Sequence, residues 1–146
     1  MYVYAAAFGG GDFAEAADCL LEAIRMEPNN VAFICDLGLC QANLGDLSGA
    51  QENFRRVSEL DDSRETREHI ATEMGDIGQR AFDYGTSLQE EGKEQEGISY
   101  KRFAIGATML AYRTHEVPDL AQQVSILARA IGDIETADQY AALASG

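Results

Sequence analysis

Tryptophan is absent from this sequence, and proline, which breaks helices, occurs only twice. The chain also lacks the alternation of polar residues with β-branched or aromatic residues that is typical of strands. Alanine, leucine, glutamate, glutamine and arginine dominate instead, and these residues favour helix. We therefore expect an all-α fold.

Long apolar runs and an export signal are also missing. No apolar run reaches the roughly 18 residues that a membrane span needs, and Met1–Ala5 lacks the basic region of a signal peptide. The three cysteines, Cys19, Cys35 and Cys40, include no Cys-x-x-Cys pair, so neither a disulfide framework nor a zinc site is indicated. We expect them to be small buried apolar residues. These features predict a cytoplasmic protein with no cofactor, no metal and no membrane partner.

Basic residues are scarce, with 11 Lys and Arg against 25 Asp and Glu and a net charge of −14. A field of this sign repels phosphate backbones, so we expect no nucleic-acid partner. It would steer basic or positively patched proteins, although solubility alone is an alternative explanation of the charge. The 146 residues are enough for a single domain, 1–146, which would bury about 68–70% of its unfolded surface.

The sequence does contain a repeated pattern of small and apolar residues. Gly11-Asp12-Phe13 and Ala16 recur 34 residues later as Gly45-Asp46-Leu47 and Ala50. Two antiparallel helices need small residues where their axes come closest, and Gly38 and Ala50 are placed for that role. Larger apolar residues fill the seam at steps of three and four: Leu37, Leu44, Leu47, Phe54 and Val57. The pattern therefore predicts a helical hairpin.

This period and these residues resemble the tetratricopeptide repeat. The resemblance implies a right-handed superhelix of antiparallel helix pairs, in which the first helix of each pair lines a concave groove that holds another protein. We expect about four pairs, in repeats at about 1–30, 31–62, 63–115 and 117–146, with the third pair elongated. Glycines and aspartates at Gly45-Asp46 and Gly132-Asp133 should end one helix and cap the next.

The third repeat departs from the period, because its turn glycine, Gly92, lies 47 residues after Gly45. Apolar residues before it are spaced alternately by four and three: Ile70, Met74, Ile77, Ala81, Tyr84 and Leu88. This spacing predicts one continuous helix through residues 63–91, capped by Asp62 with Glu65 and bent, if anywhere, at Gly75–Gly78. The other expected helices span about 12–26, with Asp12 as cap, 31–44, 47–60 and 95–114. Another starts at Glu116-Val117-Pro118 and ends at Gly132, and Asp133 caps the last.

The groove positions follow from the register of the resemblance. They are Tyr2, Ala5 and Phe8 in the first repeat, Cys35, Asp36 and Leu39 in the second, Phe82, Asp83 and Thr86 in the third, and Gln122, Gln123 and Ile126 in the fourth. Phe8, Leu39 and Phe82 could instead be core residues. Some members of the family hold acidic peptides with basic and amide side chains. The matching positions here are Asp36 and Asp83, so we expect the groove to prefer apolar segments that carry Lys or Arg.

No catalytic signature accompanies this pattern, so we do not expect an enzyme. The two histidines, His69 and His115, are far apart, and His69 is expected on the outer face of the long helix. No serine lies in a Gly-x-Ser-x-Gly elbow, and Gly9-Gly10-Gly11 lacks the Lys-Ser/Thr of a phosphate-binding loop. The expected function is a scaffold that binds a partner protein.

Two alternatives stay open. Tyr2-Val3-Tyr4-Ala5 and Leu37-Gly38-Leu39-Cys40 resemble the first two repeats of type III secretion chaperones for translocator proteins, although the long third helix departs from that group. The second alternative is a self-assembling structural module. Apolar residues at the two ends of the repeat array, such as Tyr2 and Leu143, predict a homodimer, with a monomer whose first helix frays as the alternative.

Overall fold

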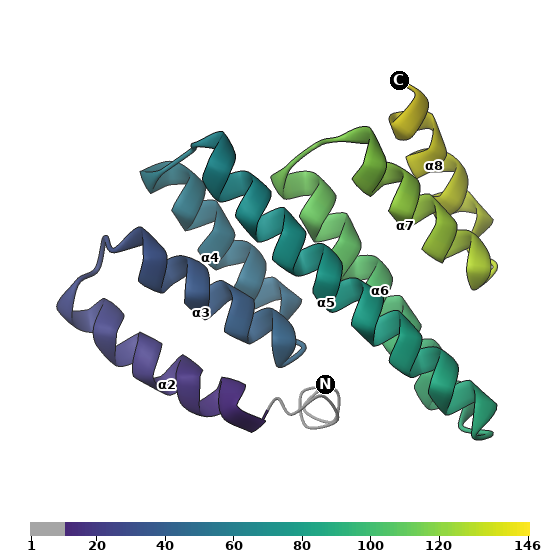
Figure 1. Ribbon diagram of the computed structural model, residues 1–146, viewed down its shortest axis with the longest axis horizontal. Coiled ribbons are helices and arrows are strands. Elements are labelled where there is room, and N and C mark those ends of the chain that lie inside the picture. Colours follow the sequence, from purple (N-terminus) through teal and green to yellow (C-terminus); the bar gives the residue numbers. More distant parts are fainter. Residues whose placement is uncertain (1–10) are drawn as a thin grey trace. The chain divides into compact units, whose positions relative to one another are not determined.

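The computed structural model describes residues 11–146, and within these residues the chain forms seven helices and no strand (Figure 1). The predicted all-α fold is confirmed. The helices are α2 (Gly11–Met26), α3 (Val31–Asn43), α4 (Leu47–Leu60), α5 (Arg64–Glu90), α6 (Glu94–Thr114), α7 (Pro118–Ala130) and α8 (Ile134–Ser145). The predictions for Tyr2, Ala5 and Phe8 lie outside the described residues.

The chain divides into two compact units, one that ends at Ile70 and one that begins at Ala71. The boundary falls inside α5, so the first turns of this helix belong to the first unit and the rest belongs to the second. A single domain over the whole chain, with four repeats, stays a prediction.

The helix boundaries agree closely with those expected from the sequence. Helix α5 is continuous through Gly75 and Gly78, so the prediction of one long helix is confirmed. Two predicted caps are wrong. Asp12 lies in the first turn of α2, because Gly11 is already helical. The cap of α5 is Ser63, whose hydroxyl accepts the N–H of Thr66 at 3.3 Å, and not Asp62.

The three hairpins α3–α4, α5–α6 and α7–α8 have turns of the same type. In each, a glycine with positive φ follows the first helix, where a residue with a Cβ would be strained. The N–H of the next residue then bonds back to a carbonyl in the last turn of the helix. The glycines are Gly45, Gly92 and Gly132, and the bonds are Asp46 to Gln41 at 2.8 Å, Lys93 to Leu88 at 2.9 Å and Asp133 to Ala128 at 3.0 Å.

Each hairpin also has a small residue seven positions before its turn glycine and another five positions after it. These pairs are Gly38 and Ala50, Gly85 and Gly97, and Ser125 and Ala137. A Cβ on Gly38 would lie 2.6 Å from the ring of Phe54, and a Cβ on Gly85 would lie 2.6 Å from the carbonyl oxygen of Gly97. The hydroxyl of Ser125 donates to the carbonyl of Ala137 at 2.7 Å. Gly85 and Gly97, and Ser125 and Ala137, therefore lie in close contact across their hairpins, whereas Gly38 meets Phe54 of α4.

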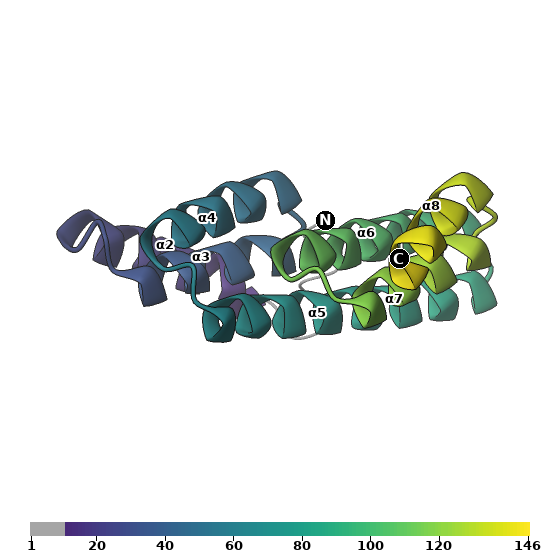
Figure 2. The same cartoon turned by 90° about the horizontal axis from the view of Figure 1, so that it is seen from above.

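The long hairpin α5–α6 has a second close approach farther from its turn. A Cβ on Gly78 would lie 2.5 Å from the hydroxyl of Thr108 and 3.0 Å from the carbonyl of Ala104. Between the two approaches, the rings of Tyr84 and Tyr100 meet edge to face, 4.9 Å apart. Figures 1 and 2 both show α6 lying antiparallel along α5.

Each unit has its own apolar core. In the first, α2 packs on α3 through Ala17, Leu37 and Cys40, with Phe13, Ala16, Leu20, Ile24 and Leu44 around them. In the second, the core comprises Ile105, Ala121, Val124, Leu127, Ala128, Ala137 and Tyr140. Cys35 and Cys40 are buried as expected, but Cys19 is exposed, so the prediction that all three cysteines are buried is wrong. Cys19 is not among the α2 residues that pack against α3.

Candidate functional site

A depression of about 430 Å³ lies in the first unit between α3 and the beginning of α5. We call it the α3–α5 depression. Its lining residues are Val31, Ala32, Cys35 and Asp36 from α3, Asp61 from the connector, and Glu65, Thr66 and His69 from α5. Volumes of this size are typical of sites that hold a small ligand or a few side chains.

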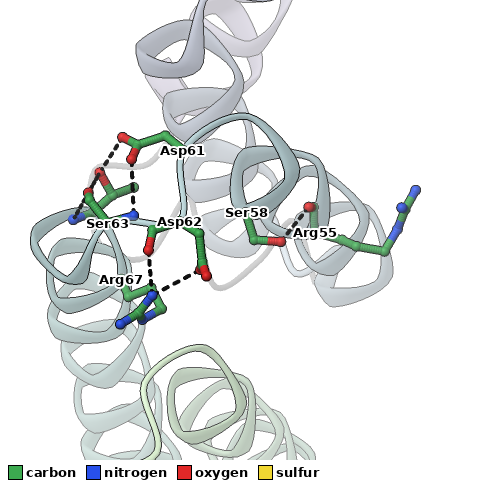
Figure 3. Close-up of polar contacts among 7 residues, drawn as sticks. Arg55, Ser58, Asp61, Asp62, Ser63 and Arg67 are labelled. Atoms are coloured by element: carbon green, nitrogen blue, oxygen red, sulfur yellow. Dashed lines mark hydrogen bonds and ion pairs between the residues drawn. The ribbon is translucent and has the colours of Figure 1, made fainter.

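The α4–α5 connector fixes one end of the depression (Figure 3). The carboxylate of Asp61 accepts the N–H of Ser63 at 3.0 Å and the hydroxyl of Thr66 at 2.9 Å. Arg67 donates to both the carbonyl and the carboxylate of Asp62, at 2.6 and 2.9 Å. These bonds hold the first turn of α5, which carries Glu65 into the lining.

The lining contains both carboxylates and apolar residues. Asp36 and Glu65 are exposed carboxylates, and within residues 11–146 neither has an ion-pair partner. Asp61 differs, because hydrogen bonds from Thr66 and Ser63 hold the pKa of its carboxyl below the ordinary value. The apolar residues of the lining are Val31, Ala32 and Cys35, which share α3 with Asp36. The arrangement can therefore receive a cation beside an apolar side chain.

The structure brings two of the predicted groove residues of the second repeat together and leaves the third outside. Cys35 and Asp36 both line the depression, although Cys35 is only 6% exposed. Leu39, one turn farther on, is half-buried and is not part of the lining. Burial raises the pKa of the Cys40 thiol, and the negative charge of Asp36 raises it further.

His69 corrects another expectation. The sequence placed it on the outer face of the long helix, but it lines the depression with Cys35 and Asp36. The outer-face prediction is wrong because Glu65 and His69, one turn apart, share a side of α5 that lies next to the buried stripe and toward α3. Their spacing of four was the available sequence signal.

In the second unit, the predicted groove residues lie on α5 and α7, and hydrogen bonds of side-chain amides link the two helices. The amide of Gln123 donates to Gln79 at 3.4 Å, and the amide of Gln79 donates to Asp83 at 3.0 Å. The hydroxyl of Thr86 donates to the carbonyl of Phe82 at 3.2 Å. The polar partners of Asp83 therefore come from neutral groups.

The remaining predicted residues of this unit differ in exposure. Gln122 is exposed, and Ile126 is 57% exposed. Phe82 is half-buried and packs against the core of the second unit, as the alternative interpretation had it, while the ε-amino group of Lys101 lies 4.8 Å from the centre of its ring. At the end of the chain, Leu143 is 45% exposed.

Within residues 11–146, no group of three or more His, Cys, Asp or Glu side chains is arranged to hold a metal ion. None of the helices described here is both long enough and apolar enough to cross a membrane.

Comparison with known proteins gives a family match and several matches among solved structures. A model of the tetratricopeptide repeat matches residues 19–52, which run from α2 through α3 into α4. No curated protein matches the chain. Among solved structures, the crystal structure of MamA matches with 18% sequence identity and a TM-score of 0.40. The match covers 99% of this chain and 94% of the MamA chain. A likeness at that score carries no argument about function.

Proposed function

This chain carries a tetratricopeptide repeat, and we propose on that premise that it is a scaffold that binds a basic segment of a partner protein in the α3–α5 depression. The repeat supports a protein-interaction scaffold in general. The proposed ligand is a peptide segment with a Lys or Arg beside apolar side chains. The cation would lie at Asp36 and Glu65, and an apolar neighbour would lie against Val31 and Ala32.

The observation that carries this proposal is the pair of carboxylates without ion-pair partners in one depression. Asp36 and Glu65 come from different helices, and neither has an ion-pair partner among the described residues, although His69 shares the lining. A basic ligand would fill that role, and the net charge of −14 would steer it toward the protein.

The test is selection from a displayed library of random peptides of about twelve residues against the full chain. Enriched peptides should combine Lys or Arg with apolar residues. Asp36→Asn with Glu65→Gln should weaken them roughly 3- to 10-fold, because each exposed charge pair contributes modestly. Binding should also weaken as salt rises from about 50 to about 500 mM.

The matched control is Asp18→Asn with Glu15→Gln, which removes the same two charges from exposed positions on α2. This variant should bind as the wild type does. Equal losses in both double variants would mean that net charge alone attracts the peptides. Acidic or uncharged peptides that depend on Asp36 would overturn the proposal. A cytoplasmic location and a homodimer stay predictions.

A further inference from the structure

The α3–α5 depression contains one charged side chain to which the proposed function gives no role. Among the described residues that line it, His69 alone can carry a positive charge. Histidine is the side chain whose charge ordinarily changes between about pH 5 and 8. His69 is also exposed, so protons reach it directly from solvent. The depression therefore carries a charge that depends on pH near neutrality.

The titratable groups around His69 come from every segment that supplies the lining. They are Cys35 and Asp36 on α3, Asp61 on the connector, and Glu65 on α5, with Glu73 one turn beyond His69 on the same helix. Carboxylates ordinarily change charge below about pH 5 and thiols above about pH 8. Between these limits, His69 is the group of this set that gains or loses a proton.

A charge on His69 would act throughout the depression. A sphere of the same volume, about 430 Å³, is about 9 Å across, which is close to the Debye length of about 8 Å at physiological ionic strength. Glu65 is nearer still, because residues four apart on a helix have Cβ atoms about 5–6 Å apart. A protonated His69 would therefore compete with a ligand cation for Asp36 and Glu65.

From this placement we infer that His69 makes the docking of the basic segment pH-dependent. Neutral His69 leaves the two carboxylates to the ligand, and protonated His69 weakens the binding. The inference rests on the proposed function and adds a regulation of the same site. Its sign follows from linkage: the complex with a cationic ligand holds fewer protons than the free chain, so affinity falls as the solution is acidified through the histidine range.

The test uses the full chain and a peptide of the enriched basic class that contains no histidine and no acidic residue. The wild type should bind this peptide roughly two- to fivefold more weakly at about pH 5.5 than at about pH 7.5, because the competing charges are exposed. His69→Gln should bring this ratio close to one. His69→Lys, which is positive at both pH values, should bind more weakly than His69→Gln at both. Glutamine and lysine favour helix, and circular dichroism should show both variants fully helical.

The matched control is His115→Gln, which removes the other histidine of the chain, at the end of α6 in the second unit. This variant should keep the wild-type ratio. The inference is overturned, and the proposed function stands, if the wild type binds the basic peptide equally at both pH values or if His69→Gln keeps the pH dependence. If no basic class is enriched, or if its binding is indifferent to Asp36 and Glu65, the proposed function fails and the inference fails with it.

Discussion

Hairpins α3–α4 and α5–α6 turn in the same way but differ in length. Helix α5 has 27 residues against 13 in α3, and α6 has 21 against 14 in α4. In both hairpins, small residues keep the same distances from the turn glycine, so the extra residues are all added at the open end. There Gly78 makes the second close approach, seven residues, or about two helical turns, from Gly85. A longer hairpin therefore needs a second small residue to keep its helices in contact.

The two hairpins also differ in what the first small residue meets. Gly38 faces the ring of Phe54, which is a side chain and can rotate. Gly85 faces the carbonyl oxygen of Gly97, which cannot move unless α6 moves. We expect the long hairpin to tolerate added volume less well at this position.

The largest change in the free energy of unfolding is expected for the substitution that adds the most volume between α3 and α4. Ala50 is fully buried, and Ala50→Leu should lower the free energy of unfolding by up to about 3 kcal/mol, because three added carbons push α3 and α4 apart. Urea unfolding measures this change. Gln51→Leu, at the exposed neighbouring position, is the control and should change stability by less than about 0.5 kcal/mol. An unchanged midpoint for Ala50→Leu would mean that the seam is not tightly packed.

The second prediction compares the two seams directly. Gly85→Ala should lower the free energy of unfolding by about 2 kcal/mol and Gly38→Ala by about 1 kcal/mol, because a ring yields more easily than a backbone carbonyl. Ser87→Ala, at an exposed position near Gly85, controls for helix propensity. The reverse order of the two effects would contradict the difference between the hairpins.

Much of this architecture was predictable because it depends on local sequence. The turn glycines, the cap at Asp46 and the alternating stripe before Gly92 are short-range signals, and each is confirmed. Ser125 was not identified as a seam residue, because a hydroxyl is not a usual substitute for glycine. Its hydrogen bond to Ala137 satisfies the buried hydroxyl, and only the coordinates show that bond.

The candidate site was predicted less completely. The repeat register counted from the turn at Gly92 predicts groove positions only on the second half of α5, at Phe82 and Asp83. The beginning of the same helix lies beside α3 and contributes Glu65 and His69 to the depression. A helix extended by several turns presents two different surfaces, and a periodic register describes only one of them.

The third prediction concerns the caps that follow the two turns. Asp46 accepts the N–H of Gly49 at 2.9 Å, whereas Lys93, at the equivalent position before α6, makes no capping bond. Asp46→Ala should therefore lower the free energy of unfolding by about 1 kcal/mol. Lys93→Asn should raise it by about 0.5–1 kcal/mol, since it adds a cap without adding an acid next to Glu94. Lys93→Ala separates the new cap from the lost lysine, and equal stability of the two Lys93 variants would show that no cap forms.

The smallest effect is expected at the glycine of α5 that has room around it. A Cβ on Gly75 would meet only Leu120, at the ordinary contact distance of 3.9 Å. Gly75→Ala should therefore raise the free energy of unfolding by up to about 0.5–1 kcal/mol, because alanine loses less backbone entropy in a helix. Gly78→Ala, one turn along the same helix, makes the same chemical change against Thr108 and should lower stability. Thermal unfolding of the two variants side by side decides the matter. If both substitutions stabilise, α5 and α6 are not in close contact at Gly78, and the second approach of the long hairpin does not exist.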